Sequence, residues 1–313
     1  KDASFSSIVD ENGLPINKAW RDNRRDELLA AYNRIKPDLL LVESFPFGRW
    51  SFRSEILPLL ECAKPLGPVL CSIRDILVPK IGSNRNREVV KIINNFFSGV
   101  LIHGDAAFIK IDETFTYASH IRGKIHYTGY VAPTARKARN ISKEEIIVSV
   151  GGGATGLLLI STAIALANSS AGKNWRWRII MGPNFPKKNG LSFKRASNMV
   201  FERFRPDFRT LLSEAVLSIS QAGYNTIMDI LVSRIRNILV PFGRNGQTEQ
   251  PLRAKKLADE NISIVVNENE LSPETLHAAI QKALLLEAPN INKLNISGAT
   301  NTAQKIKAVM GIK

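Results

Sequence analysis

The segment Ser220-Gln221-Ala222-Gly223-Tyr224-Asn225-Thr226, which follows a short apolar run at residues 216–219, constrains the architecture more than any other part of the sequence. We interpret it as a buried strand, a turn of small residues and the start of a helix that carries Asp229 one turn in. Free backbone N–H groups at a helix N-terminus, together with the helix dipole, bind phosphate. The stretch therefore predicts an anion site on a strand–turn–helix unit, although Tyr224 and Asn225 also fit ordinary turn positions.

A second predicted strand ends in Pro241-Phe242-Gly243, ahead of the adjacent pair Glu249 and Gln250. A carboxylate and an amide side by side can hold sugar hydroxyls, and so can Asp229. Each has a plainer interpretation, because Asp229 could stabilise its own helix dipole and Gln250 could cap a helix. Combined with the anion turn, these residues predict a nucleotide-sugar site.

A glycine-rich loop supports this interpretation. The apolar run at residues 146–150 predicts a buried parallel strand, and it ends in Gly151-Gly152-Gly153-Ala154-Thr155-Gly156 before a helical run. Glycine lets the backbone approach a ligand closely. The loop matches neither a Walker sequence nor a regular dinucleotide fingerprint, so it is either a phosphate loop or a tight turn between strand and helix.

The composition narrows the class of protein. The 313 residues carry 43 Lys and Arg against 28 Asp and Glu, which gives a net charge of +15. Two cysteines and four scattered histidines indicate a reducing, cytoplasmic and metal-free protein. Basic residues concentrate in residues 173–209, where they form either a solvated surface or an attraction for an anionic substrate or membrane surface. Sequence motifs of nucleic-acid readers are not evident, so we expect no specific nucleic-acid partner.

Short apolar strands alternate with helices, which predicts an α/β protein with parallel sheets. We expect two doubly wound, Rossmann-like domains at residues 1–133 and 146–313, joined by a polar linker at residues 134–145, with the last helix returning to the first domain. Ligands in such sheets bind beyond the carboxyl ends of the strands, and the motifs described above lie at such ends.

The first domain offers acceptor-side candidates after its first predicted strand. Phe45 and Phe47 predict either an apolar lip, flanked by Glu43 and Arg49, or a turn with buried aromatic rings. Arg74 follows the next strand, where it could contact a substrate or pair internally with its neighbour.

His103 ends a further predicted strand of the first domain. Neutral imidazole can accept a proton near neutral pH, so His103 is a candidate acid/base group. The alternative interpretation is a hydrogen-bonded histidine at a strand end.

These motifs carry a resemblance to known proteins. The second half resembles the C-terminal domain of the family 28 GT-B glycosyltransferases, the family of the N-acetylglucosaminyltransferase that forms lipid II. The whole chain is similar to a bacterial group described as predicted glycosyltransferases. The matching motifs are Val42-Glu43-Ser44-Phe45-Pro46-Phe47-Gly48-Arg49, Ser72-Ile73-Arg74-Asp75-Ile76-Leu77, His126-Tyr127-Thr128-Gly129-Tyr130 and Ser218-Ile219-Ser220-Gln221-Ala222-Gly223-Tyr224-Asn225-Thr226. The resemblance implies two domains facing a cleft, and a first domain that lacks its N-terminal segment here.

The resemblance also implies donor-site roles. The matching positions are Gly151, Gly152 and Gly153 near the diphosphate, Phe204 and Arg205 beside the base, and Gln221, Ala222, Gly223, Tyr224 and Asn225 around the α-phosphate. Asp229 stands where the family has a glutamate that binds the ribose hydroxyls. Because its side chain is shorter by one methylene, the Asp229 carboxylate reaches less far than that of a glutamate. Glu249 and Gln250 stand where the family has a pair that holds the donor sugar.

The implied reaction is a metal-independent, inverting transfer of a hexose or N-acetylhexosamine from a nucleotide diphosphate sugar, a UDP-sugar by expectation, to an acceptor hydroxyl. No cofactor besides this donor is expected. A lipid-linked or cell-envelope acceptor would bring the protein to the inner face of the cytoplasmic membrane as a peripheral protein. The resemblance implies a base in that N-terminal segment, and Glu43 and His103 are the candidates among the residues present. Two alternatives stay open: an enzyme like the UDP-N-acetylhexosamine 2-epimerases, and a non-catalytic nucleotide-sugar-binding protein.

Overall fold

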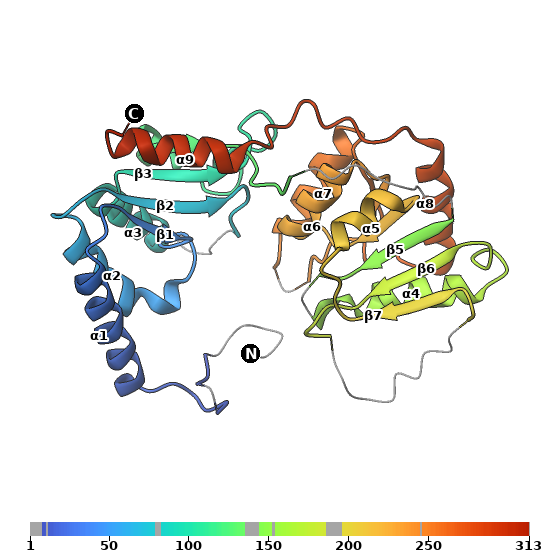
Figure 1. The fold of residues 1–313 in the computed structure, drawn as a ribbon, viewed down its shortest axis with the longest axis horizontal. Helices are drawn as coiled ribbons and strands as arrows, with labels where there is room; N and C mark the ends of the chain where they lie inside the picture. Colours follow the sequence, from blue (N-terminus) through green and yellow to red (C-terminus); the bar gives the residue numbers. More distant parts are fainter. Residues whose placement is uncertain are drawn as a thin grey trace. The chain divides into compact units, whose positions relative to one another are not determined.

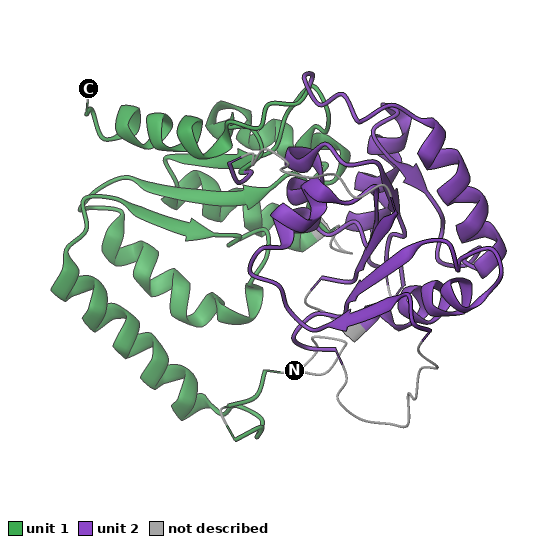
Figure 2. Cartoon of the chain, turned by 45° about the vertical axis from the view of Figure 1, so that its right-hand side comes forward, with its two compact units in different colours: residues 1–131, 294–313 green, residues 132–293 purple. Residues whose placement is uncertain are grey.

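The computed structural model describes residues 8–10, 12–78, 83–134, 144–151, 154–185, 196–244 and 246–312. The chain divides into two compact units, which Figure 2 shows in different colours. Unit 1 consists of residues 1–131 and 294–313, and unit 2 consists of residues 132–293. Each unit is built around one parallel sheet with helical crossovers, so the predicted α/β class with parallel sheets is confirmed.

The sheet of unit 1 has the order β1-β2-β3-β4, and all its strands are parallel. The strands are β1 (Leu40–Glu43), β2 (Val69–Arg74), β3 (Gly99–His103) and β4 (Ile125–Tyr127). Helices α2 (Arg53–Ala63) and α3 (Ser83–Phe96) connect the first three strands, and α1 (Lys18–Ile35) packs against α2 (Figure 1). The backbone order places Glu43, Ser72, Arg74 and His103 at the carboxyl end of this sheet.

The C-terminal helix α9 (Gly298–Val309) belongs to unit 1. Its first residue approaches the chain after β4 closely, because the Gly298 N–H donates to the Tyr130 carbonyl at 2.9 Å. A side chain at Gly298 would collide with the carbonyl oxygens of Gly129 and Tyr130. Glycine is therefore required where α9 begins.

The sheet of unit 2 has the order β10-β9-β8-β5-β6-β7, again all parallel. Its strands are β5 (Glu145–Ser149), β6 (Arg176–Ile180), β7 (Met199–Glu202), β8 (Leu217–Ser220), β9 (Asn237–Leu239) and β10 (Ile264–Val265). Within unit 2, β5 is the first strand along the sequence and lies in the middle of the sheet. Strands β6 and β7 follow on one side of β5, and the chain then crosses to form β8 on its other side. The strand order therefore reverses between β5 and β8, the place where doubly wound sheets bind ligands.

The helices of unit 2 are α4 (Leu157–Asn168), α5 (Phe208–Glu214), α6 (Tyr224–Ser233), α7 (Glu249–Asp259) and α8 (Pro273–Leu285), as Figure 1 shows. Helices α4 and α8 pack together over a core that includes Ile146, Val148 and Ile219 from the central strands. Helix α5 packs against α6. None of the described helices combines the length and the apolar character needed to cross a membrane.

Candidate functional site

The two loops of unit 2 that we predicted separately lie side by side, because β5 and β8 are adjacent strands. Gln221, at the end of β8, donates from Nε2 to the carbonyl and the hydroxyl oxygen of Thr155, both at 3.4 Å. Gly151 has a φ of +61°, and a Cβ there would lie 3.9 Å from the Thr226 hydroxyl oxygen on α6. The glycine loop therefore reaches the first turn of α6. Gly152 and Gly153 lie outside the described residues.

Helix α6 begins directly after the small-residue turn. Its N-cap residue is Gly223, which has no side chain to accept a hydrogen bond from the first turn. A Cβ added at Gly223 would meet nothing within 4 Å, so the space in front of the helix is open. Asn225 is exposed in this turn, and the ring of Tyr224 is buried beneath it. The geometry is that of an anion site at a helix N-terminus.

Gln250 joins two of the loops. Its Oε1 accepts hydrogen bonds from the N–H of Ala222 at 3.0 Å and from the N–H of Phe242 at 3.1 Å. The first N–H belongs to the loop after β8 and the second to the loop after β9. The amide oxygen of Gln250 therefore holds the two loops together, and Nε2 is the atom of this amide that can face a ligand.

Both main-chain polar groups of Ala222 are hydrogen-bonded within unit 2. Its N–H is engaged by Gln250, and its carbonyl accepts from Arg253 Nη1 at 2.9 Å. These two hydrogen bonds fix the shape of the turn before α6. Gln221 is also buried against the glycine loop, so its side chain links the two loops.

Arg253 is a site residue that our sequence analysis missed. It is only 1% exposed, its Nη2 donates to Glu249 Oε1 at 2.9 Å, and its guanidinium lies 5.6 Å from the ring centroid of Tyr224. A buried cation therefore sits behind the anion turn and holds Glu249, whose side chain keeps 25% of its surface exposed. The spacing of Glu249 and Arg253, four residues apart on one helix, was a usable signal for the pair.

Asp229 lies on α6 and faces α5, where Arg209 Nε is 3.9 Å from its Oδ1. Burial raises the pKa of the Asp229 carboxyl, and the positive charge of Arg209 opposes that shift. A partly buried carboxylate with a distant cation retains hydrogen-bonding capacity for hydroxyl groups. This is the property that a ribose-binding carboxylate needs.

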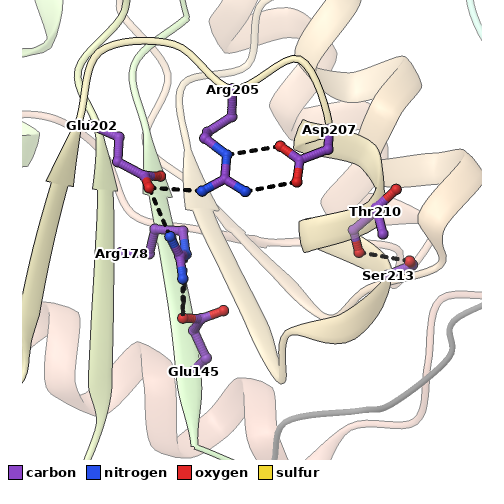
Figure 3. Close-up of polar contacts among 7 residues, drawn as sticks. All are labelled: Glu145, Arg178, Glu202, Arg205, Asp207, Thr210 and Ser213. Atoms are coloured by element: carbon purple, nitrogen blue, oxygen red, sulfur yellow. Dashed lines mark hydrogen bonds and ion pairs between the residues drawn. The ribbon is translucent and has the colours of Figure 1, made fainter.

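Arg205 is held in a chain of ion pairs, drawn in Figure 3. It donates to both carboxylate oxygens of Asp207 at 2.7 Å and to Glu202 Oε1 at 2.8 Å. The same Glu202 oxygen accepts from Arg178 at 2.9 Å, and Arg178 also donates to Glu145. The hydrogen bonds to Asp207 raise the pKa of Arg205 above its ordinary value. The Arg205 guanidinium is thus hydrogen-bonded to the carboxylates of Asp207 and Glu202.

Phe204 precedes this network and is 68% exposed. An exposed aromatic ring gives a flat surface on which a nucleobase can stack. The loop that carries it leads into α5, which packs against α6 and Asp229. The residues expected beside the base and the ribose therefore lie on neighbouring elements.

The prediction that Phe45 and Phe47 form an exposed apolar lip in unit 1 is wrong. Phe45 is 0% exposed and stacks on Trp50 at a centroid distance of 5.9 Å, and Phe47 is 6% exposed and meets Phe115 edge-on at 5.2 Å. Both rings belong to the core of unit 1. Burial of large aromatic surface favours this placement over an exposed loop.

The charged side chains of Glu43 and Arg49, which flank the turn with Phe45 and Phe47, are exposed. Arg49 donates to Glu43 at 2.8 Å in an exposed ion pair. Glu43 is in register with Ser72, and Arg74 is in register with His103, so all four residues project from one face at the carboxyl end of the sheet. The structure thus brings together the candidates Glu43, Arg74 and His103.

His103 is hydrogen-bonded at both ring nitrogens. Nε2 lies 2.7 Å from the Ser72 hydroxyl oxygen and Nδ1 lies 3.1 Å from the Thr128 hydroxyl oxygen. Burial lowers the pKa of His103, and the negative charge of Glu43 opposes that shift. The lowered pKa favours the neutral form of the ring. Among the described residues, no group of three or more histidine, cysteine, aspartate or glutamate side chains could hold a metal ion.

Comparison with known proteins places this geometry in a family. The model of the glycosyltransferase family 28 C-terminal domain matches residues 147–309. The UDP-N-acetylglucosamine--N-acetylmuramyl-(pentapeptide) pyrophosphoryl-undecaprenol N-acetylglucosamine transferase of Trichodesmium erythraeum is 27% identical over 160 residues, which are 51% of this chain and 41% of that protein. The enzyme of the same name from Clostridium perfringens strain SM101 is 31% identical over 107 residues, which are 34% of this chain and 30% of that protein. This chain thus spans less than half the length of these relatives.

Solved structures show the same fold. A calicheamicin glycosyltransferase aligns with a TM-score of 0.59 at 13% identity, covering 98% of this chain and 82% of that one. MurG of Acinetobacter baumannii aligns with a TM-score of 0.54 at 16% identity, covering 95% of this chain and 83% of that one. Both likenesses establish a GT-B type of fold for the two parallel-sheet units. Because the family match extends over more than half of the 313 residues, the chain belongs to glycosyltransferase family 28.

Proposed function

We propose that this chain binds a UDP-sugar through unit 2 and transfers the sugar to an acceptor hydroxyl that unit 1 binds. The observation that carries the proposal is the convergence of the loops after β5, β8 and β9 at one edge of the sheet, around the uncapped N-terminus of α6. Such an edge provides backbone donors for a diphosphate and side chains for the groups at both of its ends.

The residues of unit 2 suit, in this order, the base, the ribose, the diphosphate and the sugar of such a donor. The ring of Phe204 stacks on the base, and the Asp229 carboxylate accepts hydrogen bonds from the ribose hydroxyls. The diphosphate lies at the N-terminus of α6, whose dipole stabilises the negative charge that grows on the leaving group. Gln250 Nε2 and the Glu249 oxygen that does not accept from Arg253 face the sugar.

The names of the curated relatives support the choice of ligands. Those enzymes use UDP-N-acetylglucosamine and a pyrophosphoryl-undecaprenol acceptor by name. We extend this to the present chain as a proposal: UDP-N-acetylglucosamine is the first donor to test, and a lipid-linked acceptor is the first acceptor. A lipid-linked acceptor would place the protein at the inner face of the cytoplasmic membrane.

The test is calorimetric titration of the chain with UDP, GDP, ADP and dTDP. We expect UDP to bind most tightly, and Asp229→Ala to weaken UDP binding by about 10-fold to 100-fold, because hydrogen bonds to a charged group contribute about 1.5–3 kcal/mol. Asp259→Ala, at the exposed end of α7, is the matched control and should leave the affinity unchanged. Absence of binding for every diphosphate, or equal affinity in wild type and Asp229→Ala, would overturn the proposed donor site.

A further inference from the structure

Arg253 holds one peptide group of the turn before α6 from the interior of unit 2. Its guanidinium is 1% exposed, and Nη1 donates to the Ala222 carbonyl at 2.9 Å. The peptide between Ala222 and Gly223 is trans, so its carbonyl and its N–H point in opposite directions. The N–H of Gly223 therefore points away from the buried guanidinium.

The N–H of Gly223 is available to a ligand. In the part of the chain that the structure describes, no group accepts a hydrogen bond from it. Gly223 is half-buried, and a Cβ added there would meet nothing within 4 Å. The residues on either side are buried, Ala222 at 0% and Tyr224 at 6% exposure. The Gly223 N–H is thus a donor at the open side of the turn, directly before the first residue of α6.

The hydrogen bond from Arg253 strengthens this donor. When the carbonyl of a peptide accepts a hydrogen bond, the peptide is polarised and its N–H becomes a stronger donor. The effect is large where the group that donates to the carbonyl is charged and where water is excluded. Both conditions hold at the Ala222 carbonyl, because the guanidinium is always protonated and the bond is buried.

Two neighbours allow a cation to be buried here. Arg253 Nη2 donates to Glu249 Oε1 at 2.9 Å, and the guanidinium lies 5.6 Å from the ring centroid of Tyr224. A buried charge needs such compensation, because its removal from water is costly. The negative charge of Glu249 also offsets that of Arg253 at longer range. The influence of Arg253 on a ligand is therefore carried by the hydrogen-bonded peptide, not by direct attraction.

The peptides on both sides are fixed as well. The Ala222 N–H donates to Gln250 Oε1 at 3.0 Å, and the Gly223 carbonyl accepts from the Ile227 N–H at 3.0 Å. The peptide between Ala222 and Gly223 is thus held at its own carbonyl and at both of its neighbours. A donor that is held in this way needs no reorganisation when an anion binds.

We propose that Arg253 is a positioning residue for the diphosphate of the donor: it orients the Gly223 N–H toward a phosphate oxygen and strengthens that hydrogen bond. This inference rests on the proposed function and adds a residue that governs affinity for the charged part of the donor without touching it. The contacts proposed for the base and the ribose, at Phe204 and Asp229, do not depend on Arg253. Arg253 therefore distinguishes a nucleoside diphosphate from the nucleoside alone.

The first measurement needs no variant. Nitrogen–proton NMR of the whole chain follows the amide proton of Gly223 during titration with UDP or with uridine. A hydrogen bond to a phosphate oxygen should move this signal downfield with UDP, whereas uridine should leave it in place. An unchanged Gly223 signal at saturating UDP would overturn the proposal.

The second measurement is calorimetric titration of wild type and variants with UDP and with uridine. Arg253→Met should weaken UDP binding about 10-fold and uridine binding less than about 2-fold, because only the diphosphate uses the Gly223 N–H. Arg253→Lys keeps a cation and a donor, so it should recover part of the UDP affinity and of the NMR shift. Lys255→Met changes an exposed cation of the same helix and should alter neither affinity.

Failure of the two proposals would look different. If UDP does not bind to wild type, the donor site is wrong and the role of Arg253 fails with it. If UDP binds to wild type, but Arg253→Met and Arg253→Lys weaken UDP and uridine by the same factor, Arg253 only supports the fold of unit 2. The positioning role alone is then wrong.

Discussion

Replacing Arg253 with methionine tests the most buried charge of the donor site. The guanidinium is 1% exposed, and its hydrogen bonds include one of 2.9 Å to the Ala222 carbonyl and one of 2.9 Å to Glu249. A hydrogen bond to a charged group contributes about 1.5–3 kcal/mol to stability, so two contribute about 3–6 kcal/mol. Methionine fills part of the volume, and Glu249 is exposed enough to regain water. We therefore expect a loss of about 3–4 kcal/mol in the free energy of unfolding of unit 2.

The assay must report unit 2 alone. The tryptophans are Trp20 and Trp50 in unit 1 and Trp175 and Trp177 in unit 2. In a background in which the first pair is replaced by phenylalanine, denaturant unfolding followed by tryptophan fluorescence measures unit 2. Calorimetry should also show weaker UDP binding, because the turn before α6 loses its support.

Matched variants identify the cause. Lys255→Met removes an exposed charge from the same helix and should change stability by less than about 0.5 kcal/mol. The double variant Arg253→Met/Glu249→Gln should cost less than the sum of the single variants, since they share one hydrogen bond. A cost for Arg253→Met below about 1 kcal/mol, or equal to that of Lys255→Met, would show that the Arg253 guanidinium does not stabilise unit 2.

Further predictions concern single side chains. Asp229→Asn should stabilise the ligand-free protein while weakening UDP binding. Burial raises the pKa of Asp229 in the folded state, so its contribution to stability is present at low pH and is lost as pH rises through that raised pKa; melting temperatures of wild type and variant should converge at low pH. Gln250→Leu should cost about 2–4 kcal/mol by leaving two backbone N–H groups unpaired, whereas Gln250→Glu should keep stability but repel the diphosphate in calorimetry. Phe47→Ala should cost about 3–5 kcal/mol, and a neutral change would contradict its core position. Burial raises the pKa of the Cys71 thiol, so iodoacetamide should label Cys62 in the native protein and Cys71 only after unfolding, as mass spectrometry would show.

The class of fold followed from the local sequence pattern, which also predicted where a donor would bind. Apolar runs of strand length, each followed by a helical pattern, can be buried only in parallel sheets covered by helices. Small residues between Ser220 and Tyr224 then locate the ligand edge, because this chemistry depends on the local backbone. The resemblance to family 28 rests on the same local motifs.

The hydrogen-bond partners of the polar side chains became known only from the fold. Arg253 reaches the carbonyl of Ala222, and Ser72 reaches His103, across sequence separations that no local pattern encodes. The turn with Phe45 and Phe47 was compatible with a lip or with a core, and burial of the rings against Trp50 and Phe115 settled it. Periodicity reports the face of an element that is buried, whereas the partner of a polar atom depends on which strands and helices the whole fold brings together.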